Sequence, residues 1–207
     1  MKSISKIQYI TQAKSTQQII EEVENVLCGG CKWIQLRMKE SEISEITKTA
    51  TILKELCATH NAIFLINDSI EVCKSVDADG VHLGKMDVST QQARAELGFD
   101  KIIGRTANTL EDIIALESEA IDYIGLGPLR FTTTKKLLSP TIGIEGYQQI
   151  FQQYKPKFPI VAVGSVTLDD IQPLLDAGLH GAAISGAIFH ATDPIAATKE
   201  FMELAEV

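Results

Sequence analysis

The chain has 207 residues, of which 45% are hydrophobic and 22% are charged, and its formal net charge is −8. This composition is typical of a folded globular protein and excludes an intrinsically disordered chain. The acidic balance argues against a protein that binds nucleic acid or an anionic membrane surface. No apolar run approaches the roughly 20 residues of a membrane-spanning helix, and the first ten residues lack a signal-peptide core. We therefore expect a cytoplasmic protein without nucleic-acid or membrane partners.

Short β-branched runs alternate with longer helical patterns along the whole chain. The runs predict strands over Ile7–Ile10, Trp33–Arg37, Ile63–Ile66, Gly80–Leu83, Ile102–Thr106, Tyr123–Leu126, Ile160–Val163 and Ala182–Ser185. The helical patterns cover Thr16–Leu27, Ser44–Thr59, Ile70–Val76, Thr90–Leu97, Leu110–Ser118, Ile144–Tyr154 and Leu168–Ala177, and a last helix follows Asp193-Pro194. Eight strand–helix units predict an α/β fold, a single (β/α)8 TIM barrel that spans residues 1–207 as one domain. A doubly wound open sheet is the alternative fold.

Cys28 and Cys31 have the CxxC spacing of a redox pair or of half a zinc site. The sequence offers no second CxxC or HxxxH pattern that would complete four metal ligands. The pair also follows a helical run, whereas a redox pair of the thioredoxin type opens a helix. We expect these cysteines to be free thiols, as is usual in a reducing compartment.

In a (β/α)8 barrel the active site lies at the carboxyl ends of the strands. Gln35, Arg37 and Lys39 alternate at the end of the second predicted strand, so an extended backbone would place them on one face. Arg37 can hold a phosphate through two hydrogen bonds, Lys39 adds a point charge, and Gln35 suits the polar edge of a heteroaromatic ring. The alternative is a set of solvated polar groups at a strand end.

Asp68 and Asp87 follow the third and fourth predicted strands. One or two carboxylates together with substrate phosphates are the usual ligands of Mg2+, so the pair predicts a metal–diphosphate site. The alternative is that each aspartate caps the helix that follows it. Capping does not explain why Asn67 accompanies Asp68.

Small and hydroxyl-bearing residues follow the last three strands. Thr132–Lys136 combines three hydroxyls with two cations, as a phosphate-binding loop would. The pairs Gly164-Ser165 and Ser185-Gly186 end the seventh and eighth strands, where this architecture often binds phosphate. Simple packing of small residues at the barrel rim is the alternative. His82 lies inside a strand and is interpreted as a structural residue.

The chain resembles the thiamine phosphate synthase family over essentially its full length. Six segments carry the resemblance, in this order: Gln35-Leu36-Arg37-Met38-Lys39, Ile66-Asn67-Asp68, Asp79-Gly80-Val81-His82-Leu83-Gly84 with Asp87, Tyr123-Ile124-Gly125-Leu126-Gly127-Pro128, Thr132-Thr133-Thr134-Lys135-Lys136, and the closing glycine/serine pairs. The family has a (β/α)8 fold. It condenses a hydroxymethylpyrimidine diphosphate with a thiazole phosphate and releases pyrophosphate.

The resemblance implies a role for each matching residue. Gln35, Arg37, Lys39, Asn67 and Thr106 would bind the pyrimidine diphosphate, and Asp68 and Asp87 would hold Mg2+. Thr132 and Thr134 would contact the thiazole phosphate with Gly164, Ser165, Ser185 and Gly186, while Lys135 would contact the diphosphate. Arg37, Lys39 and Lys135 would act catalytically by stabilising the departing pyrophosphate. The expected partners are these two phosphorylated small molecules, and a homo-oligomer is left open.

Three residues depart from the family pattern: Asn108 replaces a common histidine, Ser165 replaces a glycine, and Leu137 replaces a polar residue. A related thiazole tautomerase, which is an isomerase, is one alternative function. That branch depends on the histidine that Asn108 replaces, and it lacks the Asn67-Asp68 pair. A non-catalytic barrel that binds phosphorylated metabolites is the other alternative, although such a protein would be expected to lose the metal carboxylates first.

Overall fold

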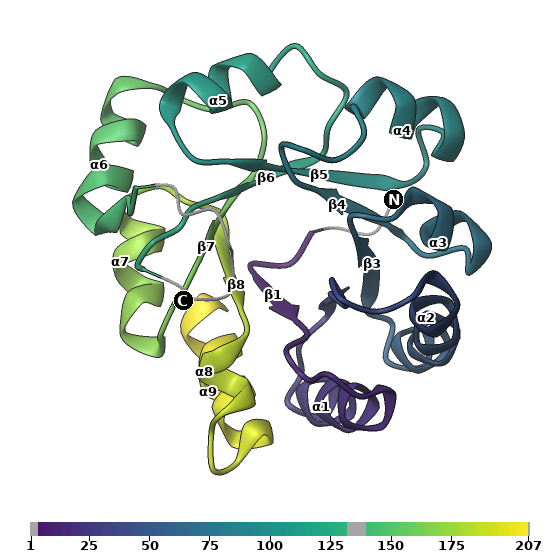
Figure 1. Cartoon of the computed structure of the whole chain (residues 1–207). Helices are drawn as coiled ribbons and strands as arrows, with labels where there is room; N and C mark the ends of the chain where they lie inside the picture. The colour runs from purple at the N-terminus through teal and green to yellow at the C-terminus, as the bar shows by residue number, and fades with distance from the viewer. Residues whose placement is uncertain (1–3, 132–139, 207) are drawn as a thin grey trace.

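The strands pair in chain order, each parallel to the next, and the last strand pairs with the first (Figure 1). The computed structural model describes residues 4–131 and 140–206. The strands are β1 (Ile7–Ile10), β2 (Trp33–Leu36), β3 (Ile63–Asn67), β4 (Gly80–Leu83), β5 (Ile102–Ala107), β6 (Tyr123–Leu126), β7 (Ile160–Val163) and β8 (Gly181–Ile184). The closed barrel confirms the predicted (β/α)8 fold and rules out the open sheet.

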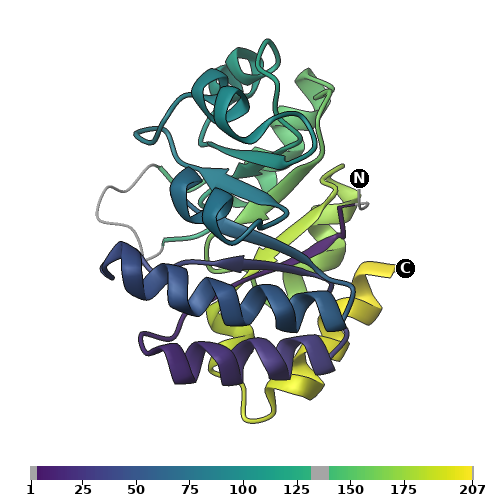
Figure 2. The same cartoon turned by 90° about the vertical axis from the view of Figure 1, so that its right-hand side faces the viewer.

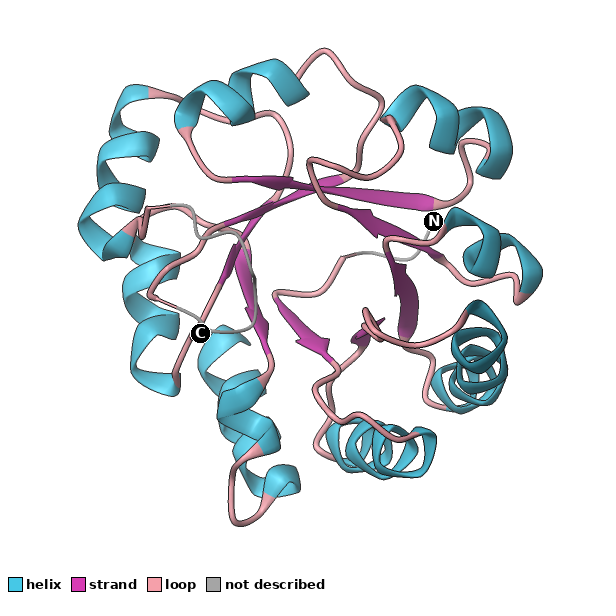
Figure 3. Cartoon of the chain, viewed as in Figure 1, coloured by secondary structure: helices cyan, strands magenta, loops and turns pink. Residues whose placement is uncertain are grey.

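The helices form an outer layer around the ring of strands (Figure 3). They are α1 (Thr16–Cys28), α2 (Ile43–Thr59), α3 (Ile70–Ser75), α4 (Thr90–Leu97), α5 (Leu110–Leu116), α6 (Gly143–Gln153), η1 (Leu168–Asp170), α7 (Ile171–Asp176), α8 (Gly186–Phe189) and α9 (Pro194–Glu206). Figure 2 shows α1 and α2 side by side along one flank of the barrel. Within the described residues, none of the helices combines the length and the apolar character needed to cross a membrane.

One predicted helix is divided in the structure. The pattern over Leu168–Ala177 predicts a continuous helix, but the segment folds as the 3-10 turn η1 followed by α7. Pro173 has no backbone N–H, so it cannot donate to the carbonyl four residues earlier in the first turn. A capping box between Thr167 and Asp170 satisfies backbone N–H groups at the start of the segment.

Two apolar layers follow from the alternation of side chains along each strand. The inward layer fills the barrel with Trp33, Ile63, Leu65, Ile102, Tyr123, Val161 and Ala183. The outward layer packs the strands against the helices. Gly181 allows closure between β8 and β1, because a Cβ atom there would lie 1.8 Å from the carbonyl oxygen of Lys6.

None of the four cysteines forms a disulfide. Cys28 is exposed at the end of α1, whereas Cys31 is buried and its thiol donates to the carbonyl of Ile7. Burial raises the pKa of Cys31 to about 11, so this thiol is protonated at neutral pH. These features identify Cys31 as a packing residue and not as half of a redox pair.

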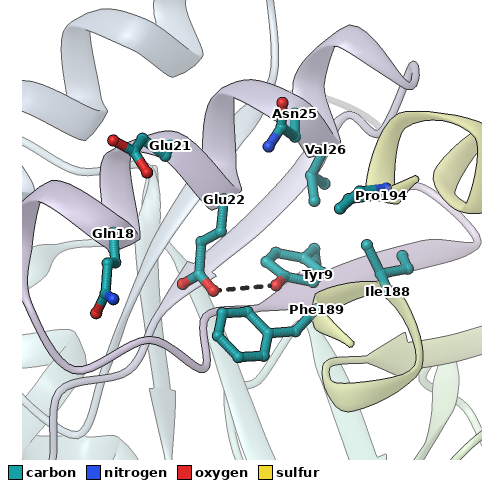
Figure 4. A pocket seen from close by; sticks show the side chains of 9 residues that line it. All are labelled: Tyr9, Gln18, Glu21, Glu22, Asn25, Val26, Ile188, Phe189 and Pro194. Carbon is teal, nitrogen blue, oxygen red and sulfur yellow. Dashed lines mark hydrogen bonds between the residues drawn. The ribbon is translucent and has the colours of Figure 1, made fainter. Parts of the chain in front are cut away.

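A buried carboxyl group fixes the loop between β1 and α1. Glu22 accepts hydrogen bonds from the hydroxyl of Tyr9 at 3.2 Å and from the backbone N–H groups of Gln12 at 3.1 Å and Ala13 at 3.2 Å. The group borders a cavity of about 210 Å³ between α1, α8 and the start of α9 (Figure 4). Burial raises the pKa of Glu22 to about 7, although the three hydrogen bonds act in the opposite direction.

The raised pKa of Glu22 predicts a specific pH dependence of stability. The folded protein holds the Glu22 proton more tightly than the unfolded chain does. Glu22 therefore contributes fully to the free energy of unfolding below the unfolded pKa of 4.5, and this contribution is lost as the pH rises through about 7. We expect the free energy of unfolding of the wild type, relative to that of Glu22→Gln, to fall by about 2 kcal/mol between about pH 5.5 and pH 8. Urea denaturation at both pH values measures this difference. Parallel pH profiles for the two proteins would contradict the assignment.

Candidate active site

The barrel register brings polar residues from different strand ends to one rim. Asn67 pairs with His82 across β3 and β4, and Thr106 pairs with Gly125 across β5 and β6. Because all strands are parallel, the loops that follow them open on the same side of the barrel. Residues predicted from separate segments of the sequence therefore share one end of the molecule.

Two carboxyl groups and a lysine meet at the ends of β3 and β4. Lys39 Nζ lies 3.2 Å from Oδ2 of Asp68, and the carboxyl group of Asp87 lies beside that of Asp68. Asp87 also accepts a hydrogen bond of 2.6 Å from the backbone N–H of Gly84. Burial and the neighbouring Asp87 raise the pKa of Asp68, and Lys39 opposes this effect. Two neighbouring carboxyl groups can offer oxygen ligands to a divalent cation.

The backbone of Asp68 holds the carboxyl group at this position. Its φ of 67° is in the left-handed region, which aspartate tolerates better than most residues. Its N–H donates to the carbonyl of His82 at 2.9 Å. The helix cap predicted as the alternative role of Asp68 is supplied by Ser69, whose hydroxyl accepts from the N–H of Val72. Likewise Ser89, and not Asp87, caps α4.

Arg37 is anchored through its backbone to the loop that follows β1. Its N–H donates to the hydroxyl of Thr11 at 2.9 Å, and the N–H of Thr11 donates to the carbonyl of Gln35 at 3.0 Å. Burial lowers the pKa of the half-buried Arg37, while the negative charges of Asp68 and Glu40 raise it. The guanidinium therefore adds positive charge beside the carboxyl pair.

The inner face of the barrel carries a connected set of polar side chains below the rim. Gln35 Nε2 donates to Gln8 Oε1 at 3.3 Å, and Gln8 Nε2 donates to the hydroxyl of Tyr123 at 3.2 Å. The same hydroxyl lies 2.9 Å from Nδ1 of His82, whose Nε2 lies 3.0 Å from Oγ1 of Thr106. The set joins Gln35 and Thr106, two residues expected to bind substrate, through three residues that the predicted site did not include.

The end of β7 has an unusual backbone that two interactions support. Gly164 has a φ of 104°, and a Cβ atom there would lie 2.7 Å from Cβ of Pro128. Ser165 follows with a φ of 51°, and its hydroxyl donates to the carbonyl of Phe131 at 3.2 Å. Arg130 donates to the carbonyl of Ser165 and forms a two-bond ion pair with the buried Asp170. The Ser165 side chain is thus held by a backbone carbonyl.

The end of β8 is tied to the loop after β1. The hydroxyl of Ser185 donates to Oε1 of Gln12 at 2.7 Å, and its carbonyl accepts from the N–H of Phe189 at 3.0 Å. Gly186 begins α8, and a Cβ atom there would make only ordinary contacts with His190. Ser185 and Gly186 therefore lie where the sequence places them, at the junction of β8 and a short helix.

Thr132, Thr134 and Lys135, together with Leu137, lie outside the described residues. The side chain of Asn108 donates to the carbonyl of Gly127 and so links the ends of β5 and β6.

The structure adds Gln8, Tyr123 and His82 to the site, and the sequence contains a weak signal for each. Gln8 is the one polar residue of β1, in the run Ile7–Ile10, and it is buried. His82 was expected to be structural, yet it contacts the substrate-binding candidate Thr106. A search for polar side chains at the inward positions of the predicted strands would have identified these residues.

Comparison with known proteins agrees with this geometry. The family model for thiamine monophosphate synthase matches residues 7–188. Thiamine-phosphate synthase of Phocaeicola vulgatus is 46% identical over 202 residues, which cover 96% of this chain and 97% of that protein. The corresponding protein of Bacteroides thetaiotaomicron is 45% identical over 204 residues, which cover 97% and 98%. The solved structure of thiamine phosphate pyrophosphorylase from Pyrococcus furiosus is 31% identical, with a TM-score of 0.84 and coverage of 97% of this chain and 95% of that chain. The chain belongs to the thiamine monophosphate synthase family.

Proposed function

We propose that this chain, as one catalytic domain, is a transferase that joins a 4-amino-2-methylpyrimidine carrying a diphosphooxymethyl group to a methylthiazole carrying a phosphoethyl group. The products are thiamine phosphate and pyrophosphate. The observation that carries the proposal is the convergence of Arg37, Lys39 and the Asp68–Asp87 pair directly above an inner face lined by Gln35 and Thr106. A charged rim suits the diphosphate, and a polar but enclosed interior suits the ring.

The carboxyl pair fits Mg2+. Asp68 and Asp87 lie side by side, and no third histidine, cysteine or carboxylate completes a metal site within residues 4–131 and 140–206. Two carboxylates with the remaining positions left to phosphate and water are the usual protein contribution to a Mg2+–diphosphate complex. When bound, Mg2+ neutralises charge on the diphosphate.

The pyrimidine would lie in the mouth of the barrel. Gln35 and Thr106 point into the interior and supply hydrogen-bonding groups, and Asn67 ends β3 beside them. Arg37 and Lys39 follow the same strand as Gln35, so a diphosphate attached to the ring would extend from the interior towards the two cations. This arrangement orients the methylene carbon between the ring and the departing group.

The thiazole phosphate would bind across the rim, at the ends of β7 and β8. Gly164, Ser165, Ser185 and Gly186 form these ends, and both Gly164 and Ser165 have a positive φ. We assign Thr132 and Thr134 to the same phosphate and Lys135 to the diphosphate. The thiazole nitrogen would then face the methylene carbon of the pyrimidine.

The reaction follows from this charge distribution. Breaking the bond between the methylene carbon and oxygen places negative charge on pyrophosphate, which Arg37, Lys39 and Lys135 stabilise. The amino group of the ring donates electron density to the carbon, so no nucleophile from the protein is needed. The thiazole nitrogen then forms the new carbon–nitrogen bond. The rate of this bond formation depends on how closely the two rings are held.

The isomerase alternative has less support. A proton transfer at a thiazole needs a base, and Asn108 stands at the position of the histidine that would serve. The amide of Asn108 donates to the carbonyl of Gly127 and is not a base.

The proposal also implies a cytoplasmic location, because the expected substrates are highly charged metabolites.

The direct test combines the purified protein with the pyrimidine diphosphate, the thiazole phosphate and Mg2+. We expect thiamine phosphate to form, and its oxidation to the fluorescent thiochrome allows it to be quantified. EDTA should abolish formation, and excess Mg2+ should restore it. A folded protein that binds either phosphate but forms no thiochrome precursor would refute the proposed activity.

The metal assignment has a test that does not use catalysis. We expect inorganic pyrophosphate with Mg2+ to raise the melting temperature by several degrees more than the two raise it separately, because ligands that bind the folded state stabilise it. Asp68→Asn and Asp87→Asn should lose this synergy. Asp77→Asn is the matched control, since Asp77 is an exposed carboxylate paired with Lys101. Synergy that persists in both site variants would remove the pair from the metal site.

A further inference from the structure

The inner face of the barrel contains a hydrogen-bonded chain of five side chains whose ends point to the proposed pyrimidine site. It runs from Gln35 through Gln8, Tyr123 and His82 to Thr106. Gln8, Gln35 and Tyr123 are almost completely buried, at 1%, 1% and 0% exposure. In such an environment each donor needs an acceptor, so the direction of one bond constrains the direction of the next.

The direction of the chain is set at the hydroxyl of Tyr123. Gln8 donates to this oxygen through Nε2, and Gln35 in turn donates to Gln8. Burial raises the pKa of Tyr123, so the hydroxyl keeps its proton. With both amides acting as donors, the neighbour that can accept this proton is Nδ1 of His82, 2.9 Å away.

This direction determines the tautomer of His82. A neutral imidazole that accepts at Nδ1 carries its hydrogen on Nε2. That hydrogen is donated to Oγ1 of Thr106 at 3.0 Å, which leaves the hydroxyl hydrogen of Thr106 free to donate elsewhere. At the opposite end, Gln35 uses its amide nitrogen within the chain, so its carbonyl oxygen is the atom that it offers to a ligand.

The backbone is shaped to hold the two aromatic rings of this chain. A Cβ atom at Gly104 would lie 2.2 Å from the ring of Tyr123, and one at Gly125 would lie 3.0 Å from the ring of His82. Trp33 packs edge-on against Tyr123, with ring centroids 4.8 Å apart. The Tyr123 and His82 rings therefore occupy space that glycines on β5 and β6 keep open, and they have little freedom to turn.

We infer that Tyr123, His82 and Gln8 are positioning residues that fix the hydrogen-bonding direction of Gln35 and Thr106, and that this direction selects an aminopyrimidine ring over an oxopyrimidine ring. The inference rests on one part of the proposed function, the binding of a pyrimidine diphosphate in the mouth of the barrel. An aminopyrimidine presents an amino donor next to a ring nitrogen that accepts. It is complementary to a carbonyl oxygen from Gln35 and a hydroxyl hydrogen from Thr106.

The opposite direction is the alternative that the inference excludes. If both amides were turned, Tyr123 would donate to Gln8, His82 would donate from Nδ1, and Gln35 would present its NH2 group. That arrangement complements a 4-oxopyrimidine, which has a carbonyl acceptor next to a ring N–H. Sites that present fixed hydrogen-bonding groups reject the wrong partner strongly, because a buried group is left unpaired.

The experiment measures binding of two ligands, the 4-amino pyrimidine diphosphate and its 4-oxo counterpart, by calorimetry in the presence of Mg2+. We expect the wild type to prefer the amino compound by about a hundredfold. Tyr123→Phe removes the hydroxyl that fixes both amides, so the preference should fall by about tenfold or more. The affinity for the thiazole phosphate should not change.

Two further variants separate positioning from general damage to the fold. Tyr147→Phe is the matched control, because Tyr147 is also fully buried and its hydroxyl donates to the carbonyl of Leu126 outside the barrel interior. It should keep the wild-type preference. Gln8→Met interrupts the chain between Gln35 and Tyr123, so its loss of preference should not add to that of Tyr123→Phe in the double variant.

The outcomes distinguish this inference from the proposed function. An unchanged preference in Tyr123→Phe, an equal loss in Tyr147→Phe, or additive losses in the double variant would overturn the inference even if thiamine phosphate forms normally. A wild type that prefers the oxo compound would overturn the direction assigned to the chain. A wild type that binds the amino compound selectively but forms no thiamine phosphate would refute the proposed function and leave the inference standing.

Discussion

Closure of the parallel strands into a barrel is the constraint on which the rest of the structure depends. Because the eight described strands are parallel and β8 pairs with β1, every strand end that carries a polar residue is brought to the same rim. The approach of β8 to the segment before β1 requires a glycine at Gly181, where no side chain would fit. The carboxyl pair of Asp68 and Asp87, which belong to neighbouring strand–loop units, depends on the parallel pairing of β3 with β4.

The site combines two environments with different physical roles. The rim holds charged groups that are partly exposed, where Lys39 and Arg37 can meet a diphosphate without a large desolvation cost. The interior holds polar side chains joined by hydrogen bonds, from Gln8 to His82, and these keep their geometry because each bond limits the next. Charge supplies the driving force for departure of pyrophosphate, and the neutral interior supplies orientation of the ring.

Much of the fold and the rim could be predicted from the sequence, because alternating apolar runs and strand-end polar residues are local patterns. The positions of Asp68 and Asp87 followed from their place after two strands. The interior chain could not be predicted in the same way. Whether His82 contacts Thr106 depends on the register between β4 and β5 and on the space left by Gly125, which are properties of the closed barrel. By contrast, Arg105 lies inside β5 next to Thr106, and its guanidinium donates to the carbonyl of Val88.

The measurement that tests the central claim most directly is phosphorus NMR of the complete reaction. The two substrates and Mg2+ are incubated with the protein, and each phosphorus-containing species is followed with time. The account predicts that pyrophosphate and thiamine phosphate appear in equal amounts, and that neither forms when the thiazole phosphate is omitted. Release of pyrophosphate without formation of thiamine phosphate, or conversion of the thiazole phosphate alone, would contradict it.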